Sequence, residues 1–101
     1  MRSERFTVLY RWKLREGFED EFVKAWMEVT EYHLRNSGSF GSRLHKGDDE
    51  IWYAYAQWPS AEARQKAFSG DELKGAGDAM SRCVEERFPE VILGVESDLL
   101  Q

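Results

Sequence analysis

The sequence contains a single cysteine, only two prolines and no long apolar run. The lone Cys83 excludes an intrachain disulfide and any metal site built from several cysteines. Because Cys83 lies in an apolar-periodic stretch, we interpret it as a core residue rather than a nucleophile. The longest uncharged segment, Ile51 to Ala61, falls short of the roughly 18 residues of a membrane span, and the apolar run from Phe6 to Tyr10 is too short for a signal peptide. We therefore predict a cytoplasmic protein with no membrane partner.

Clustered basic residues are also missing. Lys and Arg total 14 against 19 Asp and Glu, which gives a net charge of −5, and the basic residues are scattered along the chain. Proteins that bind nucleic acid need grouped Lys and Arg side chains to neutralise phosphates. The sequence therefore predicts no nucleic-acid partner.

Motifs for metals and nucleotide cofactors are absent as well. Neither His33 nor His45 has another His, Cys or carboxylate at zinc-ligand spacing. The acidic segment Gly47 to Glu50 is typical of a solvated turn rather than a calcium site. Gly75-Ala76-Gly77 lacks the further glycine of a dinucleotide fingerprint. We predict no metal and no cofactor.

Aromatic residues, in contrast, are abundant. The chain has 101 residues, which predicts a single domain over residues 1–101. It carries four Trp, four Tyr and six Phe. A domain of this size has a small core. The aromatic excess therefore predicts that some rings line a pocket, a subunit interface or both.

The first half of the chain shows clear periodicity. Alternating apolar residues predict a strand over Phe6 to Leu14, and helical spacing predicts a helix over Phe18 to Arg35. Two further apolar segments, Phe40 to Lys46 and Ile51 to Trp58, flank the Gly47 to Glu50 turn and predict a β-hairpin.

The second half predicts two helices and a last strand. Ser60 is placed to cap a short helix over Ala61 to Phe68, and Ser69 begins a capping-box pattern for a helix whose apolar stripe runs to Arg87. A strand over Val91 to Val95 follows Pro89. The resulting order, βαββαβ, predicts an α+β ferredoxin-like fold in which a four-stranded antiparallel sheet is covered by helices on one face.

One face of such a sheet stays uncovered. Apolar side chains on that face would pack against the same face of a second copy, so we predict a homodimer through sheet faces. The candidate interface residues are Leu9, Phe40, Leu44, Ile51, Tyr53 and Tyr55.

The facing of the hairpin side chains depends on its register. A two- or four-residue loop pairs His45 with Trp52 and Arg43 with Ala54, and places both polar residues on the face of Trp58. A three-residue loop would shift the register by one and send Arg43 and His45 to the opposite face.

With the first register, these residues enclose a cavity. Small residues leave space on the sheet face, aromatic residues wall it, and a helix covers it, which is typical of small-ligand pockets. The predicted lining residues are Tyr10, Trp12, Trp26, His33 and Trp52. The alternative interpretation is structural: small residues let helices pack closely, His33 interacts with a helix dipole, and His45 is solvated.

Two motifs resemble a known family. Glu21, Phe22 and Trp26 on the first helix, and Tyr-Ala-Gln-Trp-Pro-Ser over Tyr55 to Ser60, are similar to the antibiotic biosynthesis monooxygenase-like family over roughly Phe6 to Phe68. The resemblance implies a dimeric α+β barrel with a substrate pocket between the sheet and the helices of each chain. Members of the family oxygenate quinols or phenols without metal or flavin, degrade haem, or have no assigned reaction, and the resemblance implies one of these for this protein.

Trp58 matches the Trp that ends the third strand in this family. In the haem-degrading branch, that Trp works with an Asn on strand one and a His on the following helix. Here Tyr10 or its neighbours take the first position, and Ala61 to Phe68 contains no His. These departures argue against haem degradation.

The remaining chemistry of the family can be set against the residues. A deprotonated phenol or quinol can itself reduce oxygen, so the protein needs to bind it, remove a proton and exclude water. Trp58, Trp52 and Tyr10 would stack on the substrate, His45 or His33 would accept the proton, and Arg43 would stabilise the oxyanion.

We therefore predict a cofactor-independent monooxygenase-like protein acting on a small aromatic molecule, with His45, Arg43 and Trp58 as catalytic residues. Two alternatives stay open. One is a non-catalytic, small-molecule-binding or structural dimer of the same fold. The other is an isomerase or decarboxylase that uses one His as its base.

Overall fold

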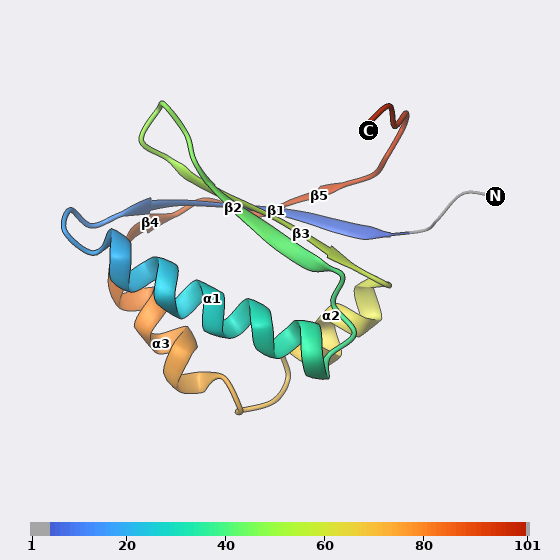
Figure 1. The fold of residues 1–101 in the computed structure, drawn as a ribbon, viewed down its shortest axis with the longest axis horizontal. Coiled ribbons are helices and arrows are strands. Elements are labelled where there is room, and N and C mark those ends of the chain that lie inside the picture. Colours follow the sequence, from blue (N-terminus) through green and yellow to red (C-terminus); the bar gives the residue numbers. More distant parts are fainter. Residues whose placement is uncertain (1–4, 101) are drawn as a thin grey trace.

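An antiparallel sheet with three helices on one face makes up the described part of the chain, residues 5–100 of a computed structural model (Figure 1). The strands are ordered β2-β3-β1-β4, and β5 also pairs with β1. This arrangement confirms the predicted α+β ferredoxin-like fold. The elements are β1 (Phe6–Leu14), α1 (Glu19–Asn36), β2 (Gly41–Lys46), β3 (Trp52–Trp58), α2 (Ala61–Ala67), α3 (Lys74–Cys83), β4 (Val84–Arg87) and β5 (Val91–Leu93).

Strand β1 lies in the middle of the sheet and shows the predicted alternation. Val8, Trp12 and Leu14 are buried, while Lys13 between the last two is exposed. Successive side chains of a strand point to opposite faces, so the even-numbered residues of β1 face the helices. Trp12 contacts the fully buried Phe22 of α1 edge-on, with 5.1 Å between ring centroids. This contact joins sheet and helix at the centre of the core.

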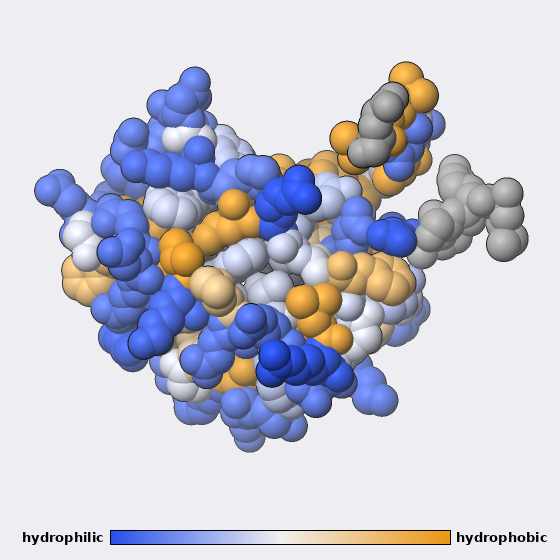
Figure 2. Space-filling model, in the orientation of Figure 1, coloured by the Kyte–Doolittle hydropathy of each residue, from blue (hydrophilic) through white to orange (hydrophobic). Residues whose placement is uncertain are grey.

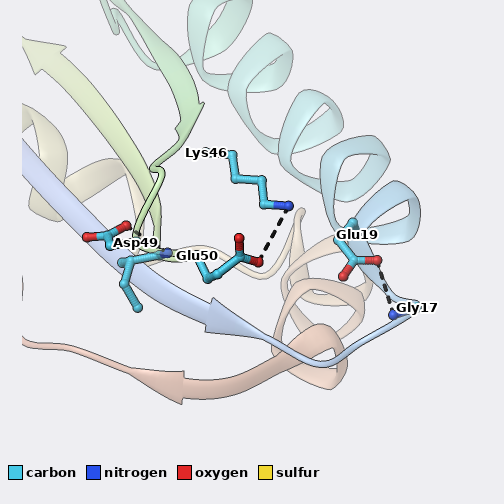
Figure 3. A network of polar contacts seen from close by, with 6 residues as sticks. Gly17, Glu19, Lys46, Asp49 and Glu50 are labelled. Carbon is cyan, nitrogen blue, oxygen red and sulfur yellow. Dashed lines mark hydrogen bonds and ion pairs between the residues drawn. The ribbon is translucent and has the colours of Figure 1, made fainter.

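Helix α1 begins and ends one residue later than the predicted helix. Its first turn carries Glu19, Asp20 and Glu21, whose negative charges interact favourably with the positive end of the helix dipole. Glu19 also reaches back to accept a hydrogen bond from the backbone N–H of Gly17 at 3.1 Å (Figure 3). Gly17 has φ +88°, a conformation that suits glycine and turns the chain from β1 into the helix.

The β2–β3 hairpin forms, but its register differs from the predicted one. The last strand pair is Lys46 with Trp52, and the backbone N–H of Gly47 donates to the carbonyl of Ile51 at 2.7 Å. Three residues therefore make the turn, and the third, Glu50, is left-handed with φ +68°. Lys46 and Glu50 face one another across this turn at 3.7 Å (Figure 3).

This register moves every β2 side chain to the other face. Arg43 pairs with Tyr55 and His45 with Tyr53, so the prediction that they share the face of Trp58 is wrong. Both are exposed on the face away from the helices. Leu44 moves to the helix-facing side: it pairs with Ala54 and packs against the core. Its predicted place on the uncovered face is therefore also wrong.

The third helix is shorter than the sequence suggested. Helix α3 ends at Cys83, and the chain continues directly as β4, which the sequence analysis missed. Val84 pairs with Leu14 of β1, and the carbonyl of Cys83 accepts a hydrogen bond from the backbone N–H of Arg15 at 2.8 Å. Pairing with the free edge of β1 thus outweighs the helical pattern. The predicted Ser69 cap does not form, because this hydroxyl donates to the carbonyl of Lys66.

Strands β4 and β5 follow the same edge of β1 and are separated by Phe88, Pro89 and Glu90. Proline has no N–H to donate to the ladder, so the pairing is interrupted there. Arg11 bridges the interruption: its carbonyl accepts from the backbone N–H of Phe88, and its guanidinium donates to the carbonyl of Pro89 at 3.0 Å. Glu90 lies in this break and lines the cavity between the sheet and the helices.

The sheet face opposite the helices is uncovered (Figure 1). Leu9, Tyr53 and Tyr55 lie on it and are half-buried, as predicted for them. Apolar side chains also gather on the C-terminal segment (Figure 2), where Val95, Leu99 and Leu100 are exposed. None of the helices within residues 5–100 has the length and apolar character needed to cross a membrane.

Candidate functional site

A cavity of about 270 Å³ lies between the helix-facing side of the sheet and the helices. This volume is just below the roughly 300 Å³ at which ligand pockets begin. An adjoining hollow of about 250 Å³ shares Val29, His33, Phe68 and Met80 with it, so the accessible space extends further toward α3. The cavity brings together most of the lining residues that the sequence predicted, namely Tyr10, Trp12, Trp26, His33 and Trp58.

Three predicted site residues lie elsewhere. Trp52 is on the helix-facing side of β3, but its ring packs against Phe22 at 6.2 Å and does not line the cavity. Arg43 and His45 lie on the opposite face of the sheet because of the hairpin register. The structure therefore places neither of these polar side chains beside Trp58.

Aromatic rings make one wall of the cavity. The buried ring of Trp58 meets His33 at 5.3 Å and Phe68 at 5.7 Å, and His33 lies 5.2 Å from Phe68. These edge-on and tilted contacts are favourable arrangements for aromatic pairs. Ala56 also lines the cavity, and its side chain is only a methyl group.

His33 is the only histidine that lines the cavity, and it is 4% exposed. Its Nδ1 lies 2.8 Å from the hydroxyl oxygen of Ser37. Two effects act on its charge. Its place in the last turn of α1 favours the imidazolium by roughly 0.3–1 kcal/mol, while burial penalises that form. Burial prevails and lowers the pKa of His33 below its usual value of 6.5, so the imidazole is neutral at pH 7.

A chain of polar contacts connects three other lining residues. Arg64 donates from Nε to the phenol oxygen of Tyr10 at 3.0 Å and forms an ion pair with Glu90 at 2.6 Å. Its guanidinium also lies over the rings of Tyr10 and Phe68. Burial raises the pKa of the Tyr10 phenol, and the Arg64 cation offsets part of this rise. Tyr10 is therefore a neutral phenol at pH 7.

Two polar atoms in the wall have no hydrogen-bond partner within residues 5–100. They are the hydroxyl oxygen of Ser42 and the indole nitrogen of Trp58, and both are buried. Native proteins rarely leave such atoms unpaired. Both atoms are closed off from the cavity as well as from bulk water. The charged and basic groups that line the cavity are the neutral base His33, the cations Arg64 and Arg87, and the carboxylate Glu90.

Sequence analysis missed Arg64, Glu90 and Ser42. Arg64 lies on a seven-residue helix with no apolar stripe to show which side faces inward. Glu90 enters the cavity because of the break after β4, and Ser42 because of the hairpin register. The sequence did indicate where helix α2 begins, because Ser60 accepts a hydrogen bond from the Ala63 N–H as predicted. It did not indicate which side chains of α2 face the cavity.

Among residues 5–100, no three His, Cys, Asp or Glu side chains lie close enough together to hold a metal ion. A flat organic molecule would fit the cavity better than a metal ion, because aromatic and aliphatic residues dominate its lining. The expectation that the protein needs no cofactor stays a prediction.

Comparison with known proteins gives one matching family and several crystal structures with a similar fold. The family model for antibiotic biosynthesis monooxygenase matches residues 5–79. A search of curated proteins gave no match. The crystal structure of SnoaB, a cofactor-independent oxygenase from Streptomyces nogalater, is similar with a TM-score of 0.83 at 15% identity and covers 97% of this chain and 99% of that one.

Two other crystal structures have the same fold. A proposed antibiotic biosynthesis monooxygenase from Nitrosomonas europaea has a TM-score of 0.80 at 13% identity, covering 95% of this chain and 94% of that one. A conserved protein from Methanosarcina mazei Go1 has a TM-score of 0.78 at 15% identity, covering 90% of this chain and 92% of that one. At these identities the likeness establishes the fold alone.

Proposed function

Because the chain belongs to the antibiotic biosynthesis monooxygenase family, we propose that it is a cofactor-independent monooxygenase acting on a small aromatic substrate of the quinol or phenol type. The observation that carries this proposal is the buried, neutral His33 in the aromatic wall of the cavity. A neutral imidazole can accept a proton from a phenol at pH 7.

The aromatic wall would bind the substrate by stacking and edge contacts. An apolar cavity of about 150 Å³ holds a benzene molecule, so the 270 Å³ here has room for a fused ring system of about two rings. Trp58 and Phe68 offer ring surface on one side, and Tyr10 offers it on another.

His33 would act as the general base. When its Nδ1–H donates to Ser37, Nε2 carries the lone pair that accepts the phenol proton. Arg64 would then stabilise the resulting oxyanion, because only its Nε and one of its terminal nitrogens are already engaged. His33 and Arg64 thus take the roles that the sequence analysis gave to His45 and Arg43.

The substrate supplies the electrons for the reaction with oxygen. The deprotonated substrate reduces O₂, and one oxygen atom forms a carbonyl on a ring carbon. The substrate loses two hydrogens, one from that carbon and one from its hydroxyl group, and the other oxygen atom leaves with them as water. The protein's own part is to bind the ring, accept and return a proton, and exclude bulk water.

Oxygen uptake tests the proposal. We expect consumption with at least one member of a panel of quinols, anthrones and phenols, and a drop of 100-fold or more in kcat for His33→Gln, the usual scale for a lost general base. The exposed histidine provides the matched control, since His45→Gln should keep the wild-type rate. Binding without oxygen uptake would instead favour a small-molecule-binding protein, and uptake unaffected by His33→Gln would exclude His33 as the base.

The protein would work as a homodimer through the uncovered sheet face. Leu9 and Tyr55 pair across β1 and β3 on this face, and Val91 of β5 pairs with Leu9 from the other side. Their apolar groups are only partly covered in one chain. Packing against the same face of a second copy would remove this surface from water. A cytoplasmic location stays a prediction.

A further inference from the structure

The ring of His33 is held in one orientation by its aromatic neighbours. The ring centroids of Trp58, Phe68 and Tyr32 lie 5.3, 5.2 and 5.7 Å from that of His33. His33 is almost fully buried, so its ring has little room to turn. This packing fixes the ring but not the proton of the neutral imidazole, which either ring nitrogen can carry.

Ser37 is fixed beside Nδ1 by the end of helix α1. Its backbone N–H donates to the carbonyl of His33 at 3.0 Å, and the backbone N–H of Ser39 donates to the same carbonyl at 3.2 Å. Gly38 between them has φ +76°, a conformation that suits glycine and turns the chain back at the helix end. The Ser37 hydroxyl is thereby held one helical turn from His33, with its oxygen 2.8 Å from Nδ1.

The helix end favours one direction of this hydrogen bond. Carbonyl groups in the last turn of a helix carry a partial negative charge, which attracts the positive end of an N–H dipole. Ser37 follows the last residue of α1, so Nδ1 is the ring nitrogen that faces this charge. A proton on Nδ1 is therefore stabilised more than a proton on Nε2, and the hydroxyl oxygen of Ser37 accepts the hydrogen bond.

With the proton on Nδ1, the lone pair is on Nε2. Nε2 has no hydrogen-bond partner within residues 5–100, yet it is not one of the unpaired polar atoms that are closed off in that part of the chain. It therefore keeps accessible surface, and the spaces next to His33 are the cavity and its adjoining hollow. A ligand in that space can reach the lone pair.

We propose that Ser37 is a positioning residue, whose hydroxyl holds His33 in the Nδ1–H tautomer and so presents the Nε2 lone pair to the cavity. The inference rests on the proposed function, in which Nε2 accepts the substrate proton. Ser37 itself does not line the cavity. It acts on the reaction only through His33.

Nuclear magnetic resonance of the imidazole nitrogens tests the tautomer without any substrate. The chain has two histidines, so His45→Gln leaves His33 as the only one and its ¹⁵N signals need no assignment. At pH 8 we expect a protonated Nδ1 and an unprotonated Nε2, the reverse of the tautomer that free histidine favours. Ser37→Ala in the same background should shift the signals toward the Nε2–H form. Ser37→Thr keeps a hydroxyl and should restore the Nδ1–H form.

Oxygen uptake measures the consequence for the reaction. Ser37→Ala should lower kcat by roughly three- to tenfold, the scale of one hydrogen bond, and leave KM unchanged because Ser37 does not touch the substrate. Asn36→Ala is the matched control. It also removes a side-chain hydrogen bond from the end of α1, donated by Nδ2 to the carbonyl of Tyr32 at 3.0 Å. Because this bond does not involve His33, the control should keep both the tautomer and kcat.

Two results would overturn the proposal: an Nε2–H tautomer in the single-histidine protein, or a tautomer that Ser37→Ala does not change. Either result leaves the proposed function standing where His33→Gln abolishes oxygen uptake. If no quinol, anthrone or phenol supports uptake, the proposed function falls. The tautomer measurement then still decides whether Ser37 sets the proton of His33.

Discussion

The guanidinium of Arg64 donates from Nε to the phenol oxygen of Tyr10 at 3.0 Å and so connects helix α2 to the central strand of the sheet. The same side chain holds Glu90 through an ion pair at 2.6 Å. Arg64 thereby makes one side of the cavity polar and charged, whereas the wall around Trp58 is aromatic. The Arg64 side chain is 18% exposed and the Glu90 side chain 40%, so the ion pair is only partly shielded from solvent.

Replacing Arg64 should disturb binding more than folding. Arg64→Met keeps most of the apolar stem but removes every donor and the charge. We expect kcat/KM for oxygen uptake to fall by roughly 10–100-fold, the scale of one or two charge-assisted hydrogen bonds. The pKa of Tyr10 should also rise further, because the variant loses the Arg64 cation, which opposes the effect of burial more strongly than the cation of Arg87 does.

Steady-state kinetics and ultraviolet difference titration of tyrosinate check these effects, with Tyr10→Phe identifying the Tyr10 signal. Arg82→Met is the matched control, since Arg82 is exposed on α3 and does not line the cavity. An Arg64→Met variant with wild-type kinetics would remove Arg64 from the proposed site.

Acid should destabilise the protein partly through His33. Its pKa in the folded state lies below the unfolded value of 6.5, so the unfolded chain binds more protons in the interval between the two. The free energy of unfolding should then be highest above about pH 6.5 and fall as the pH drops toward the folded-state pKa. Below that pKa both states are protonated, and His33 adds no further slope.

Chemical denaturation between pH 5 and pH 8 measures this contribution as the difference between wild type and His33→Gln. The slope assigned to His33 should disappear in that variant, because glutamine does not titrate. His45→Gln changes the same residue type on the exposed sheet face and should keep the slope. An identical slope in wild type and His33→Gln would show that burial of His33 does not govern its protonation.

The hairpin register predicts that Arg43 and His45 are dispensable for chemistry. Both lie on the face away from the cavity, paired with Tyr55 and Tyr53. Arg43→Ala and His45→Ala should each keep kcat for oxygen uptake within about twofold of wild type, because neither side chain lines the cavity. A large loss of kcat in either variant, at unchanged oligomeric state, would contradict the register.

A charge on the uncovered sheet face should separate the proposed dimer. Leu9→Glu places a carboxylate in the middle of that face, and burying it against a second copy is costly. Analytical ultracentrifugation should show a dimer for wild type and a shift toward monomer for this variant. Met27→Glu makes the same change at an exposed site on α1 and should leave the dimer intact. A monomeric wild type would refute the interface outright.

The periodic elements could be read from the sequence because their side-chain pattern depends on local geometry. Alternation over β1 placed Val8, Trp12 and Leu14 on one face, where all three are buried, and helical spacing placed Phe22 and Trp26 together on α1, where both pack against the core. A strand or helix repeats its faces at a fixed period whatever packs against it. For this reason the fold class and one aromatic wall of the site were predictable.

Two departures from prediction had causes that the side-chain period does not reveal. Helix α3 ends at Cys83 because Val84 pairs with the edge of β1, far away in the sequence. The hairpin register depends on a three-residue turn in which Glu50 adopts a left-handed conformation that glutamate rarely takes. Glycine or asparagine is the usual residue at a left-handed turn position, so the glutamate at position 50 did not indicate this turn.

By itself, the sequence determined which faces of β1 and α1 are buried, and with them the fold and the aromatic character of the cavity. Only the tertiary structure decided which polar groups enter that cavity. The hairpin register brings in Ser42 and excludes His45, and the break at Pro89 lets Glu90 meet Arg64 across 26 residues of chain. The physical reason is that side-chain period depends only on the type of element. The hairpin register depends on the turn conformation at Glu50, and the strand interruption on Pro89 and on pairing with β1 far away in the sequence.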